Sequence, residues 1–184
     1  MIYLFTGNGK GKTTAAIGTG IRAVGAGLSV LMVQFMKVKE LSSEYRVLEK
    51  LDRFDVVSFG RKGFYLPEEE LEKNPRLKEK GFKPLSKIDY QLAEEGIEYV
   101  KNALLNEKYN LYILDELCVA LHYRVVEENG VKKFLLDYRE KFDFIITGRY
   151  CPDWLIDIAD LVTEMKEIKH PFQKGLTAKK GIDF

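Results

Sequence analysis

The nine residues TGNGKGKTT at positions 6–14 follow a short apolar run and precede a segment with helical spacing of apolar residues. Three glycines within five positions allow backbone N–H groups to point into a concavity without Cβ clashes, and the start of a helix adds partial positive charge. Lys12 can reach phosphate oxygens, and the Thr13 hydroxyl can bind Mg²⁺. The stretch therefore predicts an ATP-binding loop between the first strand and the first helix of an α/β protein.

This loop departs from the pattern GxxxxGK(S/T) because Thr6 stands in the place of the first glycine, so the triphosphate is expected to sit differently. The alternative is a glycine-rich turn with an exposed lysine, but GKT between a strand and a helix favours phosphate binding. The residues expected to contact the nucleotide are Gly7, Asn8, Gly9, Lys10, Gly11, Lys12, Thr13 and Thr14.

Outside the loop, short apolar runs alternate with longer helical patterns, which predicts a mostly parallel six-stranded sheet flanked by helices. With a glycine loop after its first strand, this is the P-loop NTPase (RecA-like) fold. The expected strands are 2–6, 30–35, 54–59, 111–114, 144–147 and 161–169.

Two helices are expected to cover the sheet, one from the glycine loop to a stop at Gly27 and one over 86–106 with Ser86 as its N-cap. In the second helix the inward-facing side chains are expected to be Ile88, Leu92, Ile97, Val100 and Leu104. Residues 67–84, rich in Glu, Lys and Pro, predict a solvated or mobile excursion within a single domain of residues 1–184.

Composition excludes several classes of function. A net charge of +1 is too small for a general polyanion-binding field, so no nucleic-acid partner is expected. Cys118 and Cys151 form no CxxC pair, which argues against a zinc site or a disulfide framework and favours a reducing cytoplasm. No apolar run approaches the roughly 18 residues of a membrane span, so neither membrane insertion nor export is expected.

A second acidic motif follows the buried run at 110–114, which ends in Asp115 and Glu116, the pattern called Walker B. In a parallel sheet this strand end and the glycine loop lie at the same carboxyl edge, where ligands bind. Either carboxylate could hold Mg²⁺ together with Thr13, directly or through water. The alternative is a strand end followed by an N-cap Asp.

Further candidates follow other strands. Arg149 could neutralise phosphate charge, although a surface ion pair is an alternative. Gln34 and Lys37 could face the same site, with a solvated lysine as the default interpretation. Among the remaining residues, Phe64 and Tyr65 could stack on a ligand or form a small satellite core, His122 is more simply structural, and spacing assigns no role to His170.

Taken together, these motifs resemble the P-loop ATP:corrinoid adenosyltransferases (cob(I)alamin or cob(I)yrinic acid a,c-diamide adenosyltransferases). The segments that carry the resemblance are 6–14, 22–25, 33–37, 114–117, 146–149, 169–172 and 181–184. The resemblance implies transfer of the 5′-deoxyadenosyl group of ATP to the cobalt of a corrinoid such as cobalamin, with release of triphosphate. It also implies a homodimer, a flavoprotein reductase as electron donor, and a nucleotide bound in the reverse direction to P-loop kinases.

The same resemblance implies roles for individual residues. Lys12, Lys10 and Arg149 would stabilise the leaving triphosphate, with Mg²⁺ on Thr13, Asp115 and Glu116. Relatives carry a Gly-Phe-x-Trp segment beneath the corrinoid where this sequence reads GFYL at 63–66, so Phe64, and Tyr65 as a substitute aromatic, would line that site. The rival interpretations are a P-loop nucleotide kinase and a RecA-like ATPase module with Glu116 activating water.

Overall fold

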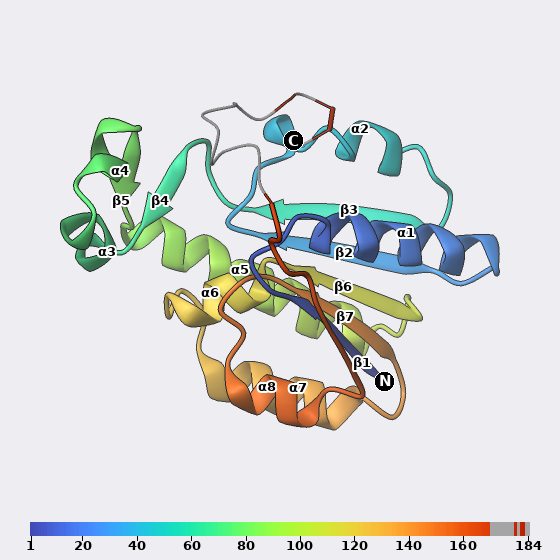
Figure 1. Cartoon of the computed structure of the whole chain (residues 1–184). Coiled ribbons are helices and arrows are strands. Elements are labelled where there is room, and N and C mark those ends of the chain that lie inside the picture. Colours follow the sequence, from blue (N-terminus) through green and yellow to red (C-terminus); the bar gives the residue numbers. More distant parts are fainter. Residues whose placement is uncertain (170–178, 180, 183–184) are drawn as a thin grey trace.

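The computed structural model describes residues 1–169, 179 and 181–182. Its main sheet has the strand order β3-β2-β6-β7-β1-β8, and every pairing in it is parallel (Figure 1). The strands are β1 (Ile2–Thr6), β2 (Val30–Phe35), β3 (Phe54–Phe59), β6 (Leu111–Asp115), β7 (Asp143–Thr147) and β8 (Leu161–Glu164). The predicted α/β class with a parallel six-stranded sheet is confirmed, and the arrangement is consistent with a P-loop NTPase-like fold.

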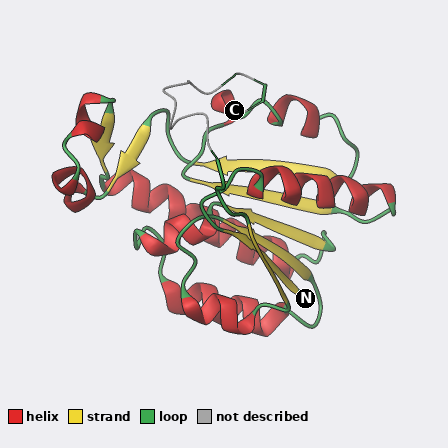
Figure 2. Ribbon diagram, in the orientation of Figure 1, coloured by secondary structure: helices red, strands yellow, loops and turns green. Residues whose placement is uncertain are grey.

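Helices cover both faces of this sheet (Figure 2). One face carries α1 (Lys12–Gly25), the 3-10 turn η1 (Lys39–Leu41) and α2 (Tyr45–Leu48). The other carries α5 (Lys87–Leu105), α6 (Leu117–His122), α7 (Glu128–Tyr138) and α8 (Asp153–Ile158). Within the described part of the chain no helix is long and apolar enough to cross a membrane.

Strand β2 illustrates how two cores form on one sheet. Leu31, Val33 and Phe35 pack toward α5, whereas Val30 and Met32 pack toward α1, because successive side chains of a strand point to opposite faces. All six residues of β2 are buried. Burial of this kind is what a parallel strand with helices on both faces requires.

The predicted end of α1 at Gly27 and the predicted start of α5 at Ser86 each have a local cause. The Gly27 N–H donates to the Val24 carbonyl (2.8 Å) and the Leu28 N–H to the Ala23 carbonyl (3.0 Å), with Gly27 at φ +86°, so a glycine in the left-handed region ends α1. Helix α5 begins after Ser86, which forms a capping box with Asp89.

Residues 64–84 form an insertion that projects beyond the main sheet (Figure 1). It contains β4 (Phe64–Leu66), α3 (Glu68–Lys73), α4 (Arg76–Glu79) and β5 (Phe82–Pro84). Strands β4 and β5 pair in parallel as a second sheet, and Leu71 of α3 is fully buried. The predicted excursion is therefore solvated over most of its length, but it is also folded into a small structure that the sequence did not predict.

Two other predictions were wrong in detail. Strand β8 ends at Glu164 and not at residue 169, because its partner β1 ends at Thr6 and the chain then turns onto the glycine loop. Ile88 is 48% exposed, since the first turn of α5 lies beside the insertion and not over the sheet. His170 and the resemblance segment 169–172 beyond residue 169 lie outside the described residues.

The contact of α1 with the sheet yields a test of packing. A Cβ at Gly20 would lie 2.7 Å from the Phe54 ring and 3.0 Å from Ile113 Cδ1, whereas a Cβ at Gly18 would meet nothing within 4 Å. We expect Gly20→Ala to lower the free energy of unfolding by about 1–2 kcal/mol, because overpacking outweighs the gain in helix propensity. Gly18→Ala on the same helix is the control and should raise it by roughly 0.5–1 kcal/mol. Urea denaturation measures both, and equal effects of the two changes would contradict this packing.

Candidate functional site

The carboxyl ends of β1, β2, β6 and β7 meet at one edge of the main sheet, as the sequence predicts for its motifs. At this edge three residues other than glycine have positive φ: Met36 (56°), Glu116 (61°) and Tyr150 (58°). Each follows the end of one of these strands. Because side chains other than glycine rarely adopt this conformation, these positions carry backbone strain at the predicted site, as Arg53, Glu107 and Arg124 do elsewhere in the described chain.

The glycine loop has the left-handed backbone that its sequence allows. Gly7 and Gly11 have φ of 96° and 110°, and Gly11 is the N-cap of α1. The Lys12 ammonium lies over the loop and donates to the carbonyls of Gly7 (2.8 Å) and Gly9 (2.7 Å). Asn8 and Thr14 are exposed on either side. The Lys12 ammonium is therefore held at the concavity by two carbonyl groups of the glycine loop.

The segment after β8 packs directly against this loop. The Gly9 N–H donates to the Met165 carbonyl (2.6 Å), and a Cβ at Gly7 or Gly9 would lie within 2.6 Å of that oxygen. Glycine is required at both positions for this close approach. The Lys10 ammonium donates to the Ile182 carbonyl, so the C-terminal part of the chain also reaches the loop.

Thr6, at the place of the missing first glycine, has a structural role. Its hydroxyl donates to the Gly148 carbonyl (2.9 Å) and so ties the end of β1 to the end of β7. The next residue, Arg149, donates from Nη2 to the Asn8 carbonyl (3.2 Å). The arginine thus lies on the glycine loop, which favours the phosphate interpretation over a surface ion pair.

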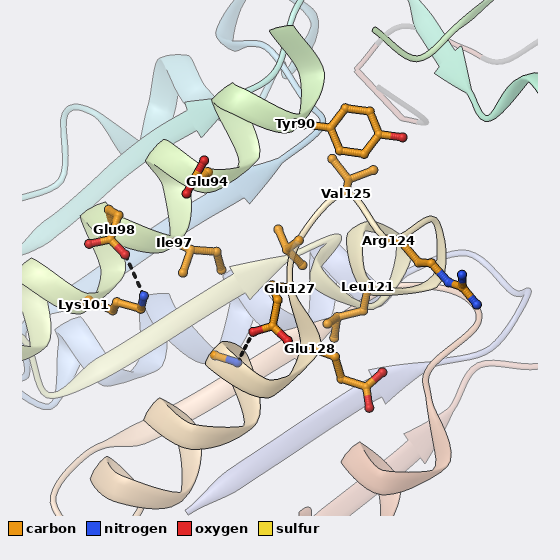
Figure 3. Close-up of a pocket in the computed structure, with 12 residues that line it drawn as sticks. Tyr90, Glu94, Ile97, Glu98, Lys101, Leu121, Arg124, Val125, Glu127 and Glu128 are labelled. Carbon is orange, nitrogen blue, oxygen red and sulfur yellow. Dashed lines mark hydrogen bonds and ion pairs between the residues drawn. The ribbon is translucent and has the colours of Figure 1, made fainter. Parts of the chain in front are cut away.

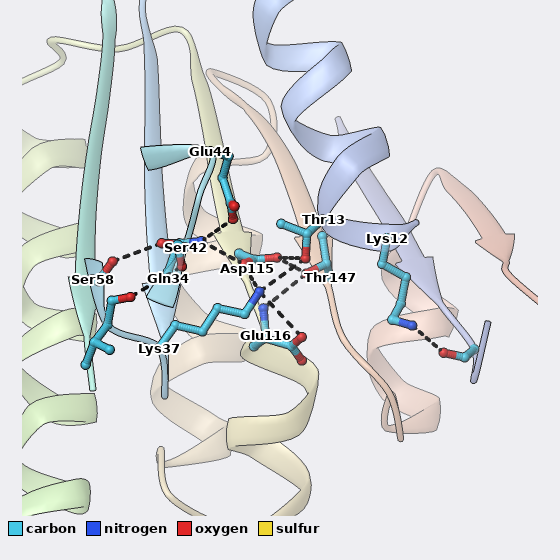
Figure 4. Close-up of polar contacts among 12 residues, drawn as sticks. Lys12, Thr13, Gln34, Lys37, Ser42, Glu44, Ser58, Asp115, Glu116 and Thr147 are labelled. Carbon is cyan, nitrogen blue, oxygen red and sulfur yellow. Dashed lines mark hydrogen bonds and ion pairs between the residues drawn. The ribbon is translucent and has the colours of Figure 1, made fainter. Parts of the chain in front are cut away.

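Asp115 is the centre of the polar network at this edge (Figure 4). Its carboxylate is fully buried, and Oδ1 accepts hydrogen bonds from the hydroxyls of Thr13 (2.8 Å) and Thr147 (2.7 Å). Its Oδ2 accepts from the Lys37 ammonium (2.7 Å) and from Gln34 Nε2 (3.3 Å). Side chains from α1, β2, the loop after β2, and β7 therefore converge on one carboxylate.

Lys37 is the site residue that sequence reasoning undervalued. Its ammonium also lies 3.3 Å from Thr13 Oγ1 and 3.7 Å from Glu116 Oε1, so it contacts all three predicted metal ligands. The default interpretation of a solvated lysine is wrong. Gln34 is likewise buried, and its Oε1 accepts from Ser58 (2.9 Å). The one available signal was their position at the end of a strand adjacent to the acidic strand.

The charges at this edge influence one another. Burial disfavours the Asp115 carboxylate, but Lys37 and the hydrogen bonds from both threonines hold its pKa below the usual range. Burial, opposed by Lys37 and reinforced by Asp115, raises the pKa of Glu116. Burial, and then the positive charge of Arg149, lowers the pKa of Lys12. A polyphosphate placed here would relieve the repulsion between these two cations.

Because the pKa of Asp115 is lowered in the folded protein, the free energy of unfolding depends on pH in a definite direction. A carboxyl whose folded-state pKa lies below its unfolded value, about 3.9, stabilises the fold fully above that pH. The contribution is lost as the pH falls through the lower folded-state value.

The donor set fits a hard divalent cation, because the Thr13 hydroxyl and the carboxylates of Asp115 and Glu116 offer only oxygen. Asp115 already accepts four hydrogen bonds, whereas the side chain of Glu116 is 26% exposed and makes one ion pair at 3.7 Å. Glu116 and Thr13 are thus better placed than Asp115 to contact such an ion directly.

The two predicted aromatics lie apart from the phosphate cluster. Phe64 is in the insertion and stacks on Phe82, while Tyr65 lies against Arg61. His122 stacks on Tyr150 at the end of α6 (4.5 Å between centroids).

A cavity of about 570 Å³ lies between α5 and the α6–α7 connection (Figure 3). Its lining includes Tyr90, Ile97, Leu121 and Arg124, but none of the residues predicted for the site. We place the candidate site at the glycine loop, because the residues predicted to bind phosphate and metal converge there, whereas none of them lines this cavity.

Comparison with known proteins identifies the family. The family model of "ATP:corrinoid adenosyltransferase BtuR/CobO/CobP" matches residues 1–184. The chain belongs to the ATP:corrinoid adenosyltransferase family. Corrinoid adenosyltransferases of Sinorhizobium sp and Escherichia coli are 33% and 34% identical to it over its whole length, which corresponds to 80% and 85% of their own lengths. The Salmonella typhimurium corrinoid adenosyltransferase CobA is 34% identical, with 100% of this chain and 85% of the relative aligned.

Membership of the adenosyltransferase family confirms the resemblance drawn from the motifs. The segments that carried it include the glycine loop, the end of β2, the acidic end of β6 and the end of β7. In this family member all four segments lie at one sheet edge and are joined by hydrogen bonds of Asp115, Thr6 and Arg149.

The ion pair of Lys37 with Asp115 can be tested by stability. We expect Lys37→Met to lower the free energy of unfolding by about 2–4 kcal/mol, because it leaves a buried carboxylate without its cation. Lys39→Met, which removes an exposed pair with Glu49, is the control and should cost less than about 1 kcal/mol. The double variant Lys37→Met/Asp115→Asn should recover part of the loss. A Lys37→Met protein as stable as wild type in urea would show that the pair contributes nothing.

Proposed function

We propose that this chain is an ATP:corrinoid adenosyltransferase that transfers the 5′-deoxyadenosyl group of ATP to the cobalt of a corrinoid in cobalamin metabolism. The observation that carries the proposal is the convergence of Lys12, Lys37 and Arg149 at the glycine loop, in a chain that belongs to this family along its full length. A site of this kind holds a polyphosphate as a leaving group.

The proposed reaction does not require the protein to transfer a proton. Co(I) of the reduced corrinoid is a strong nucleophile and attacks C5′ of the ribose. The cobalt–carbon bond forms while the C5′–O5′ bond breaks, and the oxygen departs with the bonding electrons as triphosphate. Cobalt gives up two electrons and becomes Co(III). No general base is needed, so the protein acts by positioning and by stabilising charge.

The chain's own residues would stabilise the charge that accumulates on the triphosphate. Lys12 and Arg149 lie on the glycine loop, and Lys10 extends from it. The N–H groups at the start of α1 add partial positive charge. The Gly9 N–H donates to Met165, so the remaining amides of the loop would carry the main-chain contacts.

We also propose that Mg²⁺ accompanies ATP and that Thr13 and Glu116 hold the ion. Asp115 would orient the Thr13 hydroxyl through the hydrogen bond between them. When bound, the ion would neutralise part of the triphosphate charge. Lys37 lies within contact distance of the same oxygens and would have to share or yield them.

The phosphate product tests the proposal. An anaerobic reaction with ATP, Mg²⁺ and chemically reduced cobalamin should release triphosphate and form a light-sensitive cobalt–carbon bond, and ATP should not turn over without cobalamin. Release of ADP independent of cobalamin would instead support a nucleotide kinase or a RecA-like ATPase module.

Substitution of Lys12 is the most direct test of the site in this assay. We expect Lys12→Ala to lower the rate of triphosphate release by about a hundredfold or more, because removal of one preorganised donor from a developing anion has effects of that size. Lys50→Ala, at an exposed position away from the sheet edge, is the control and should react at the wild-type rate. Near-normal turnover by the Lys12 variant would contradict the site assignment.

Phe64 offers a test of the corrinoid side of the site. We propose that Phe64 and Tyr65 exclude water from the lower face of the corrinoid and so favour cobalt without an axial ligand, which is easier to reduce. The motivating observation is that Phe64 is 62% exposed, is stacked on Phe82 and belongs to neither core cluster.

With Co(II) substrate and an external reductase, we expect Phe64→Ala to slow adenosylation about tenfold or more, the scale of one lost aromatic contact of about 1.5 kcal/mol. The loss should be smaller when cobalamin is supplied as Co(I). Leu105→Ala, an exposed apolar change at the far end of α5, serves as the control. Equal rates for the Phe64 variant and wild type with Co(II) would refute this role.

Three further proposals concern partners and location. A homodimer and an electron-donating flavoprotein reductase are implied by the family resemblance. A cytoplasmic location is supported by the need for Co(I) and by Cys118 and Cys151, which are both free thiols. Sedimentation, co-purification with a reductase and cell fractionation would test them separately.

A further inference from the structure

The segment 60–66, here called the aromatic loop, comprises the connection after β3 and the strand β4, which carries Phe64 and Tyr65. Neither aromatic belongs to the two main hydrophobic clusters, and Phe64 stacks on Phe82 of β5 with centroids 5.1 Å apart and planes at 30°. Since this stack lies within the insertion, it does not fix the insertion relative to the main sheet. The contacts that orient the aromatic loop relative to the main sheet are therefore those that it makes outside the insertion.

Arg61 is the principal anchor. Its Nε donates to Asp89 Oδ1 (2.7 Å), and its Nη2 donates to Asp89 Oδ2 (2.5 Å) and to Ser86 Oγ (3.0 Å). Two parallel hydrogen bonds of this kind require the planar guanidinium of arginine. They fix the orientation of the Arg61 side chain as well as its distance from Asp89. The same guanidinium lies 3.6 Å from the centre of the Tyr65 ring, so one side chain joins the aromatic loop to the start of α5.

The other partner of this pair is rigid. The Asp89 side chain is 8% exposed and also accepts from the Ser86 N–H (2.7 Å) as part of the α5 capping box. Burial disfavours its carboxylate, but the bonds from Arg61 and Ser86 outweigh burial and hold the Asp89 pKa below its usual range. Further along the same helix, Val100 and Leu104 are fully buried against the sheet.

A second anchor connects the aromatic loop to the nucleotide edge. A Cβ at Gly60 would lie 2.6 Å from the backbone of Met36 and Lys37, and the Met36 N–H donates to the Phe59 carbonyl (2.8 Å). One end of the aromatic loop is thus packed on the segment that carries Lys37, while Arg61 fixes its direction toward α5.

We propose that Arg61 is a positioning residue for the corrinoid: its clamp on Asp89 holds Phe64 and Tyr65 in the orientation that receives the planar ring system. The inference rests on the proposed function. It assigns to Arg61 an effect on corrinoid affinity and none on ATP affinity, because the clamp touches the aromatic loop and α5 but not the glycine loop.

The test compares Arg61→Ala, Arg61→Lys and the control Arg76→Ala, which lies on α4 of the adjoining insertion. Cobalamin, supplied as Co(II) with an external reductase, and ATP are varied separately, and triphosphate is measured. We expect Arg61→Ala to raise KM for cobalamin about tenfold, the scale of one lost charge-assisted contact, with KM for ATP within about twofold of wild type. Arg61→Lys should recover part of the loss, and Arg76→Ala should behave as wild type.

Hydrogen exchange supplies a readout that is independent of activity. In Arg61→Ala, amides of residues 60–66 should exchange faster, while those of the glycine loop at 7–14 keep their wild-type rates. An unchanged KM for cobalamin, or a parallel rise in both KM values, would overturn the positioning role while leaving the proposed function intact. A wild-type protein that makes no triphosphate with cobalamin would remove the proposed function itself, and the role of Arg61 with it.

Discussion

The buried carboxylate of Asp115 is the constraint on which the site depends. A charge without contact with water must be fully paired, and here the hydroxyls of Thr13 and Thr147, the Gln34 amide and the Lys37 ammonium supply the partners. These four partners come from three segments at the carboxyl edge of the sheet. Satisfying one carboxylate therefore fixes the glycine loop, the end of β2 and the end of β7 relative to one another.

The glycine loop is held from its other side by the main chain. Thr6 bonds to Gly148, and the Gly9 N–H bonds to Met165, so both neighbouring strands of β1 contribute to the shape of the loop. Lys12 is oriented by the carbonyls of its own loop. A leaving group that carries several negative charges gains most from donors that are already in place, because no reorganisation is needed as the charge develops.

The aromatic loop is held in place by contacts of a different kind. Phe64 is exposed, Tyr65 and Leu66 are half-buried, and the segment is held by polar contacts of Arg61 and by the close approach of Gly60 to the chain after β2. The phosphate edge and the aromatic loop therefore meet at residues 36–37. In the proposed transfer between a nucleotide and a corrinoid, each substrate would be held by its own segment of the chain.

The sequence by itself determined the class of fold, the strands β1, β2 and β3 to the residue, the start of α5 after Ser86 and the glycine turn between β1 and α1, because these depend on local spacing, turn residues and capping. It also led to the correct family. Only the tertiary structure decided that Lys37 pairs with Asp115, 78 residues away, and that Arg61 pairs with Asp89. It also decided that Ile88 is exposed and that β4 pairs with β5. Strands of three residues have too little periodicity to be recognised, and side-chain partners distant in sequence are set by the register of neighbouring parallel strands, which no local pattern encodes.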